Sequence, residues 1–180
     1  MDNKLEYINL SKKLYTDKLI QKSKSIKLLA FDVDGVLTDG GLYFDHNGNE
    51  SKKFYAQDGH GIKILQSIGI ETMIISGRKS KCVSHRADEL GIERVIQGSR
   101  DKLKSFQEKE ILLSSEEICF VGDDTVDIEL LQYVGLSVIV PNSNSILKEL
   151  NFDWVTPRQG GYGAIRDVCD LIYFSKVNNE

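Results

Sequence analysis

Two aspartates, Asp32 and Asp34, stand two positions apart directly after the apolar run from Ile26 to Ala30. Such a run is typical of a buried parallel strand, and side chains at i and i+2 of an extended chain point the same way. Both carboxylates should therefore project into the crevice at the carboxyl edge of a sheet. Two adjacent anions repel each other, so they need a cation, a cluster of donors or a shared proton. Taken alone, the pair fits an acidic turn equally well.

Further polar side chains follow later apolar runs and help to decide between these interpretations. Ser76 follows the run 71–75, and the run 118–121 leads into Gly122-Asp123-Asp124-Thr125-Val126-Asp127. Lys102 lies near the start of an expected helix. Singly, these residues fit a turn, a solvated lysine or a helix start where carboxylates favour the dipole. Because strand ends in an open α/β sheet share one crevice, the whole set predicts a single polar site.

Apolar strands alternate with helical segments through most of the chain. Expected strands cover 26–30, 71–75, 92–96, 118–121 and 136–140, and expected helices cover 59–68, 78–90, 102–113, the segment through Leu130 and Leu131, 146–150 and about 160–174. This alternation predicts an α/β fold, a Rossmann-like, mainly parallel sheet with helices on both faces. A chain of 180 residues suits one such domain, which we place at 26–180.

Residues 41–55 interrupt this alternation with a predicted β-hairpin. Asn47-Gly48 is a strong hairpin signal because both residues tolerate positive φ. A two-stranded hairpin alone is marginally stable in water. We therefore expect other subunits to cover its aromatic side chains, Tyr43, Phe44, Phe54 and Tyr55.

Residues 1–25 are rich in Lys and carry apolar residues at helical spacing, namely Leu5, Ile8, Tyr15 and Leu19. The spacing predicts an amphipathic helix that packs on the domain or on a neighbouring subunit. A helix lying on a membrane surface is the less favoured alternative.

Composition narrows the class of protein. A net charge of -4 without a basic face argues against a nucleic-acid partner. No apolar run approaches the ~20 residues of a membrane helix, so we expect no membrane association. The cysteines lack metal-ligand spacing and suggest free thiols in a reducing cytoplasm; they are Cys82, Cys119 and Cys169.

The motifs, taken in order, resemble those of the haloacid dehalogenase superfamily of phosphatases. The matching elements are D-x-D-G-x-x-T, a strand ending in Ser, a Lys and G-D-D-x-x-D, and the resemblance covers about 26–175. It implies that Asp32 is the nucleophile and Asp34 the general acid and base. It also implies that Ser76 and Lys102 bind the transferring phosphoryl group.

The same resemblance implies a Mg²⁺ site. Asp32, Asp123 and the backbone carbonyl of Asp34 would hold the ion. Asp127 would orient the lysine and support the metal shell, with Asp124 beside it. A hard cation held by oxygen ligands would bring the carboxylate nucleophile and the anionic ester together despite their repulsion.

The short distance in sequence between Asp34 and Ser76 leaves room for only the hairpin and one helix, so we expect no cap domain. The segments that sharpen the match are 35–40, 57–62, 76–79 and 160–166. They closely resemble capless phosphatases of 3-deoxy-D-manno-octulosonate 8-phosphate. That resemblance implies a cytoplasmic, Mg²⁺-dependent homotetramer that supplies a sugar acid for lipopolysaccharide.

The resemblance also implies a substrate pocket. Arg78 would meet the acidic or hydroxyl end of the sugar-acid phosphate, and the pocket would be lined by Gln57, Asp58 and Gly59. A neighbour's C-terminal segment, 158–180, would close the site as a lid. Tyr162 stands where we expect a basic side chain, which leaves contact between the lid and the substrate carboxylate open.

Two alternatives stay open. Close relatives act on 9-phosphates of nonulosonic acids such as sialic acid, and the motifs do not separate the two substrate groups. The second alternative is a non-catalytic module, either a receiver-like domain or an oligomerisation domain of the same fold. A receiver carries its reactive aspartate on the third strand, whereas Asp32 follows the first. An inactive scaffold should lack Asp32, Asp34 or Lys102, and all three are present.

Overall fold

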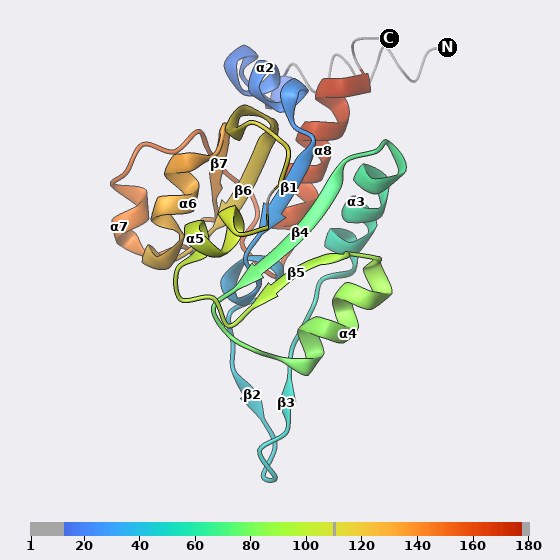
Figure 1. Cartoon of the computed structure of the whole chain (residues 1–180), viewed down its shortest axis with the longest axis vertical. Helices are drawn as coiled ribbons and strands as arrows, with labels where there is room; N and C mark the ends of the chain where they lie inside the picture. Colours follow the sequence, from blue (N-terminus) through green and yellow to red (C-terminus); the bar gives the residue numbers. More distant parts are fainter. Residues whose placement is uncertain (1–12, 110, 178–180) are drawn as a thin grey trace.

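A six-stranded parallel sheet forms the centre of the computed structural model, which describes residues 13–109 and 111–177 (Figure 1). Its strand order is β5-β4-β1-β6-β7-β8. The bounds are β1 (Leu28–Phe31), β4 (Glu71–Ser76), β5 (Arg94–Gln97), β6 (Ile118–Gly122), β7 (Leu136–Ile139) and β8 (Trp154–Val155). The α/β fold expected from the sequence is confirmed.

The register of the central strands aligns their carboxyl ends. Phe31 of β1 lies opposite Ile74 of β4 on one side and Val121 of β6 on the other. Residues that follow these three strands therefore emerge at one edge of the sheet. Every residue of β1 and β6 is buried, as expected for parallel strands covered on both faces.

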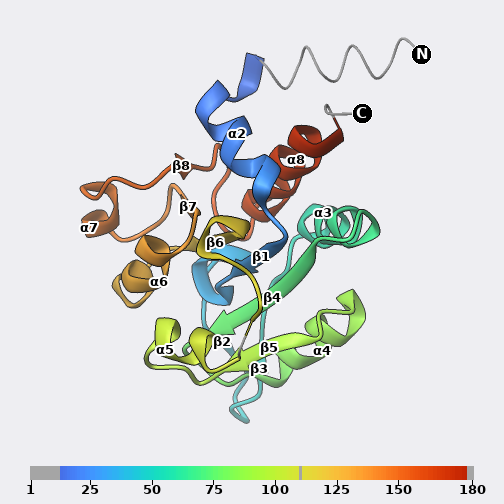
Figure 2. The same ribbon diagram turned by 45° about the horizontal axis from the view of Figure 1, so that its top comes forward.

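Helices cover both faces of the sheet (Figures 1 and 2). One layer holds α2 (Asp17–Ser25), α3 (Ala56–Ser67), α4 (Lys81–Leu90) and α8 (Ala164–Val177), and the other holds α5 (Lys102–Gln107), α6 (Ile128–Tyr133) and α7 (Ser145–Lys148). The first layer buries an apolar cluster that includes Ile62, Val83 and Val168 against the sheet. The second buries a separate cluster that includes Phe106, Leu130 and Leu147.

Several element boundaries differ from those expected. Strand β8 was not expected, because a two-residue strand gives no readable pattern. Helix α5 ends at Gln107 instead of near residue 113. Helix α4 begins at residue 81 instead of 78 because Ser80 has extended backbone angles. Helix α8 begins at residue 164, after a turn in which Gly161 and Gly163 have positive φ.

The predicted hairpin is present and projects from the body of the molecule as β2 (Tyr43–Phe44) and β3 (Glu50–Ser51) (Figure 1). Its turn is closed by the Asp45 carboxylate, which accepts hydrogen bonds from the backbone N–H groups of Asn47 and Asn49. The aromatic side chains divide into two groups. Tyr43 and Phe44 are exposed, whereas Phe54 is half-buried and packs against the core.

The predicted N-terminal helix, 1–25, is described only from residue 13, because residues 1–12 lie outside the described residues. In this part α2 begins at Asp17, because Thr16 has extended backbone angles and its side chain accepts the backbone N–H of Leu19. Leu19 is buried, and Lys22 pairs with Asp153 at 2.5 Å. Helix α2 therefore packs on its own domain. No helix in the described part of the chain is long and apolar enough to cross a membrane.

Most of the predicted lid segment belongs to the core. Helix α8 packs beside α3, and Ile165, Leu171 and Ile172 are fully buried. The apolar face of α8 is therefore held in its own subunit. Residues 178–180 lie outside the described residues, and the lid role of 158–180 stays a prediction.

Candidate active site

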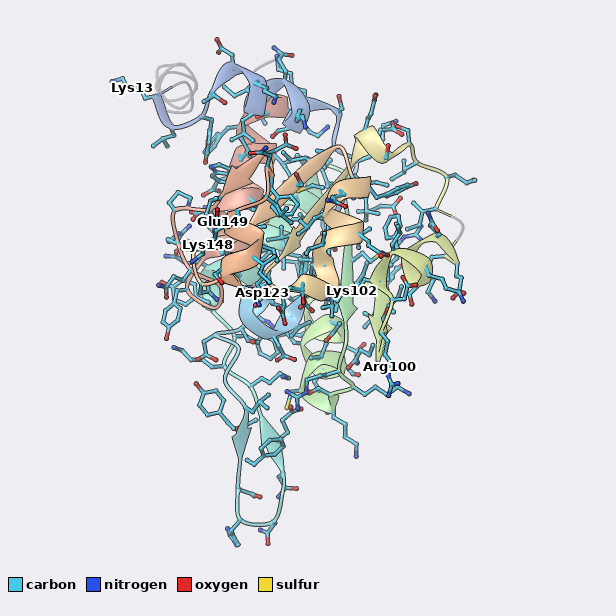
Figure 3. The ribbon with its side chains drawn as sticks, turned by 90° about the vertical axis from the view of Figure 1, so that its left-hand side faces the viewer. Lys13, Arg100, Lys102, Asp123, Lys148 and Glu149 are labelled. Carbon is cyan, nitrogen blue, oxygen red and sulfur yellow. The ribbon has the colours of Figure 1, made fainter. Side chains whose placement is uncertain are left out.

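Lys102 is the centre of a buried group of charges at the carboxyl edge of the sheet. Figure 3 shows it near Asp123, on the side from which the hairpin projects. Its Nζ lies 3.0 Å from Oδ2 of Asp32 and 2.5 Å from Oδ1 of Asp127. The lysine side chain is 1% exposed. We call Asp32, Lys102, Asp123 and Asp127 the inner cluster.

The turn after β6 fixes two members of the inner cluster. Oδ2 of Asp127 accepts the backbone N–H groups of Asp123 at 3.0 Å and Asp124 at 3.1 Å. In return, the side chain of Asp124 caps the short helix η3 (Thr125–Asp127) by accepting the N–H of Thr125. This capping box satisfies donors that would otherwise be unpaired and aims the remaining oxygen of Asp127 at Lys102.

The turn after β1 carries the D-x-D-G-x-x-T motif and lies against the G-D-D-x-x-D motif after β6. Asp32 leads into the turn η1 (Val33–Leu37), where Gly35 has φ of +94°. A Cβ at this glycine would lie 2.0 Å from Oδ2 of Asp123. A side chain at position 35 would therefore be strained and would displace Asp123, so the site requires glycine here.

The inner cluster holds more negative than positive charge. Burial raises the pKa of Asp32 to about 6, although Lys102 opposes this shift. Burial and then the nearby Asp32 raise the pKa of Asp123 to about 8. Burial would lower the pKa of Lys102, but the carboxylates of Asp32 and Asp127 outweigh it and raise this pKa. Lys102 thus stays protonated, and further positive charge is needed to keep the carboxylates ionised.

The inner cluster fits a divalent cation. One oxygen from each of Asp32, Asp123 and Asp127 lies within 4.8 Å of the others. Within residues 13–109 and 111–177, no hydrogen-bond partner contacts Oδ1 of Asp32 or Oδ1 of Asp123, and both atoms are buried. Buried unpaired carboxylate oxygens are costly, and oxygen donors of this type are the ligands that Mg²⁺ prefers. A metal role for the backbone carbonyl of Asp34 stays a prediction.

A second group of charges lies beside the first, and we call Asp34, Glu50, Lys52 and Arg78 the outer cluster. Nζ of Lys52 pairs with Oδ1 of Asp34, and the Lys52 side chain is 1% exposed. Nη2 of Arg78 donates to Oε1 of Glu50 at 2.8 Å, and its Nη1 lies 3.8 Å from Oδ2 of Asp34. Asp34 and Arg78 were candidates from the sequence.

Glu50 and Lys52 were missed by sequence reasoning. Glu50 begins β3 and Lys52 directly follows it, and alternate residues of an extended chain point to the same side. This alternation was the only signal, and an acidic and a basic residue on a hairpin normally indicate a solvated face. Their contacts with Asp34 and Arg78 instead bring the hairpin into the site.

Ser76 ends β4 at the same edge of the sheet and is 2% exposed. Its hydroxyl oxygen accepts the backbone N–H of Arg78 at 3.3 Å, which shapes the loop that carries the arginine. Its predicted part in binding a phosphoryl group stays a prediction.

The three other predicted pocket residues contact neighbouring elements. Gln57 accepts from Nη1 of Arg158 at 2.7 Å, and a Cβ at Gly59 would lie 2.4 Å from the side chain of Arg86. Asp58 is fully buried and accepts the backbone N–H of Arg166 at 2.8 Å, near the start of α8. Contacts of Gln57, Asp58 and Gly59 with substrate stay predictions.

The glycine segment 158–163 packs on η1 of its own chain. The side chain of Asn142 donates to the carbonyl of Gly35 at 2.9 Å and accepts the N–H of Gly160 at 2.8 Å. Gly161 donates to the carbonyl of Val36 at 3.0 Å. A Cβ at Gly160 would lie 1.7 Å from the Gly35 carbonyl oxygen, so only glycine permits this approach. Asn142 is a further site-supporting residue that the sequence analysis missed.

The fold and the inner cluster together define a haloacid dehalogenase-like hydrolase. Carboxylates follow the first strand and β6, a serine ends β4, and a lysine joins the two acidic turns. The family model described as haloacid dehalogenase-like hydrolase matches residues 102–163.

Comparisons over nearly the whole chain narrow this class. The 3-deoxy-D-manno-octulosonate 8-phosphate phosphatase KdsC of Escherichia coli K12 is 41% identical over 160 residues, 88% of this chain and 85% of its own. The chain belongs to the family of 3-deoxy-D-manno-octulosonate 8-phosphate phosphatases.

Two solved structures agree with this assignment. The phosphatase of Moraxella catarrhalis, in complex with a magnesium ion, a phosphate ion and KDO, has a TM-score of 0.87 and 39% identity, covering 91% of this chain and 95% of that one. The cobalt-bound phosphatase of Haemophilus influenzae has a TM-score of 0.79 and 34% identity, covering 87% and 92%.

Proposed function

We propose that this protein hydrolyses 3-deoxy-D-manno-octulosonate 8-phosphate to the free sugar acid and inorganic phosphate. The inner cluster carries the proposal, because it combines a buried carboxylate nucleophile with a fixed ammonium and a place for a cation. The family supports the choice of substrate. The product would serve lipopolysaccharide precursor synthesis.

In the first step, a carboxylate oxygen of Asp32 attacks phosphorus in line with the ester bond. The new O–P bond forms as the bond between phosphorus and the sugar oxygen breaks, leaving an aspartyl phosphate. Asp34 gives its proton to the departing oxygen. Lys102 and Ser76 stabilise negative charge on the transferring phosphoryl group.

In the second step, water attacks the phosphorus of the aspartyl phosphate. Asp34, now ionised, accepts a proton from that water, and the O–P bond to Asp32 breaks. Phosphate leaves and both carboxylates return to their starting states. Asp127 takes no direct part, because its oxygens already hold Lys102 and the turn after β6.

Mg²⁺ bound by Asp32 and Asp123 would neutralise charge on the phosphoryl oxygens and keep Asp32 ionised. Asp34 differs from Asp32 because its carboxylate pairs with Lys52 instead of Lys102.

We also propose that the protein works in the cytoplasm as a homotetramer. The exposed hairpin residues support assembly, because Leu42, Tyr43 and Phe44 are 57%, 44% and 56% exposed. Light scattering at micromolar concentration should give four times the chain mass, and a monomeric mass would contradict the proposal.

The function is tested by phosphate release from a substrate panel. The panel holds 3-deoxy-D-manno-octulosonate 8-phosphate, sialic acid 9-phosphate, its deaminated analogue and hexose phosphates, each with Mg²⁺ and with chelator. We expect a Mg²⁺-dependent preference for the first compound. Preference for a 9-phosphate would identify a nonulosonate 9-phosphate as the substrate. If no compound released phosphate, a non-catalytic module would be favoured.

A further inference from the structure

Glu50 has the contacts of a residue that holds others in place. Its Oε1 accepts from Nη2 of Arg78 at 2.8 Å, and its Oε2 accepts from the hydroxyl of Ser80. Nζ of Lys52 lies 3.5 Å from Oε1. Both carboxylate oxygens are therefore engaged by groups from the loop after β4, and the side chain is only 16% exposed.

The backbone of Glu50 is fixed as well. It pairs with Phe44 across the hairpin, and its carbonyl oxygen accepts from Sγ of Cys82 at 3.4 Å. The hydrogen bond from Ser80, assisted by Lys52 and Arg78, lowers the pKa of Glu50, which keeps it ionised at neutral pH. The hairpin thus presents a fixed anion to the arginine.

Arg78 uses only one edge of its guanidinium group for this contact. Its Nη1 is buried and has no hydrogen-bond partner, and it lies 3.8 Å from Oδ2 of Asp34. A guanidinium with one nitrogen held and another without a hydrogen bond keeps donor capacity for an anionic group. The unpaired nitrogen lies next to the carboxylate that would protonate the leaving group.

We infer that Glu50 is a positioning residue for substrate specificity: it holds Nη2 of Arg78 so that the rest of the guanidinium meets the acidic or hydroxyl end of the sugar-acid phosphate. This inference rests on the proposed function and deepens it. The hairpin therefore has a part in substrate recognition inside its own subunit, separate from any part in assembly.

The charges of the outer cluster support this assignment. Asp34 and Glu50 balance Lys52 and Arg78, with two charges of each sign. Without Glu50, Arg78 would lose the hydrogen-bonded partner that fixes its guanidinium. The arginine would then no longer be held for the substrate.

The test compares two phosphate esters in each variant. Steady-state kinetics are measured with 3-deoxy-D-manno-octulosonate 8-phosphate and with D-arabinose 5-phosphate, which has no carboxylate. In Glu50→Ala we expect KM for the sugar acid to rise about tenfold, the effect of one lost charge-assisted contact, with kcat changed less than about twofold. The kinetic constants for arabinose 5-phosphate should stay within about twofold, as expected for a contact that this ester does not make.

Three further variants sharpen the test. Glu50→Gln keeps an acceptor oxygen but loses the charge, so its KM should lie between the unmodified and alanine values. In an Arg78→Ala background, Glu50→Ala should have no further effect on KM. Glu71→Ala is the matched control. Glu71 lies away from the site and accepts a hydrogen bond of 2.7 Å from Arg94, so its removal should leave the kinetic constants of both esters unchanged.

The outcomes separate this inference from the proposed function. If the unmodified enzyme releases no phosphate from the sugar acid, the proposed function fails before any variant is compared. If the unmodified enzyme is active, equal losses on both esters would assign Glu50 a purely structural role. An unchanged KM for the sugar acid in Glu50→Ala would also overturn the inference. So would an undiminished effect of Glu50→Ala on KM in the Arg78→Ala background.

Discussion

The inner and outer clusters lie side by side, yet their charges differ in kind. The inner cluster sets three carboxylates against one ammonium, and two of its carboxylate oxygens are buried and unpartnered. The outer cluster sets two carboxylates against two cations, and its unpartnered buried atom is a donor, Nη1 of Arg78. One group therefore lacks positive charge, and the other can accept a negative group. We propose that phosphoryl transfer belongs to the inner cluster, with Asp34 of the outer cluster as general acid and base, and that Arg78 and Glu50 of the outer cluster serve substrate recognition.

The largest expected effect follows from removing the nucleophile. Asp32→Asn should lower kcat by roughly 10⁴-fold or more, because an amide cannot form the covalent intermediate. The variant should stay folded, since it removes a buried negative charge from a cluster with too many. Phosphate release and thermal unfolding check the two halves of the prediction. Retained turnover would remove Asp32 from the chemistry.

Removing the cation of the inner cluster should affect both activity and stability. Lys102→Met should lower kcat by about 10²- to 10³-fold, because charge on the phosphoryl oxygens loses a fixed ammonium. It should also lower the free energy of unfolding by about 3 kcal/mol, since Asp32 and Asp127 lose their shared partner.

The matched control for Lys102 is Lys27→Met. Lys27 pairs with Glu117 at 2.5 Å but is 61% exposed, so its loss should cost less than about 1 kcal/mol. Urea unfolding measures both variants. Equal losses would show that burial does not distinguish the inner cluster from the surface.

Metal binding should distinguish the two clusters directly. Mg²⁺ at a hundred times its dissociation constant should stabilise the folded protein by about 2.7 kcal/mol. Asp123→Asn should reduce the rise in melting temperature that Mg²⁺ produces, whereas Glu50→Gln should preserve that rise. Calorimetric scans with and without Mg²⁺ give the comparison. If the outer variant loses the Mg²⁺ response and the inner variant keeps it, the division of charge is wrong.

A buried carboxylate outside both clusters gives the smallest effect. Burial raises the pKa of Asp58 from 3.8 to about 6, so the folded protein binds more protons than the unfolded chain between these values. The free energy of unfolding should therefore fall as pH rises through this window, by about 2 to 3 kcal/mol for this group.

Asp58→Asn removes that titration and keeps an acceptor for the N–H of Arg166. The difference in stability between the variant and the unmodified protein should grow in favour of the variant from pH 4 to pH 7. Taking the difference at each pH cancels the other carboxylates. A constant difference would show that Asp58 does not titrate in this range.

The sequence revealed the residues whose positions depend on strand ends. Asp32, Ser76 and Asp123 follow apolar runs, and parallel strands bring such residues to one edge by topology alone. The resemblance to the haloacid dehalogenase superfamily supplied Asp127 as the partner of Lys102. Both predictions needed only the order of elements along the chain.

The sequence did not reveal residues whose roles depend on how a loop packs against its neighbours. Glu50 and Lys52 enter the site because the root of the hairpin approaches the loop after β4, and no local pattern encodes that approach. Asn142 is similar, since it joins η1 to the glycine segment. The sequence also did not reveal that Asp58 is fully buried and accepts the backbone N–H of Arg166.

The most direct test measures kcat and KM for 3-deoxy-D-manno-octulosonate 8-phosphate with Mg²⁺ in Asp32→Asn and Arg78→Ala, beside the unmodified enzyme. The account predicts that Asp32→Asn loses kcat, whereas Arg78→Ala mainly raises KM, so that the nucleophile serves chemistry and the arginine serves recognition. If Arg78→Ala lost kcat as severely as Asp32→Asn at an unchanged KM, Arg78 would belong to the chemistry and the recognition role would be wrong.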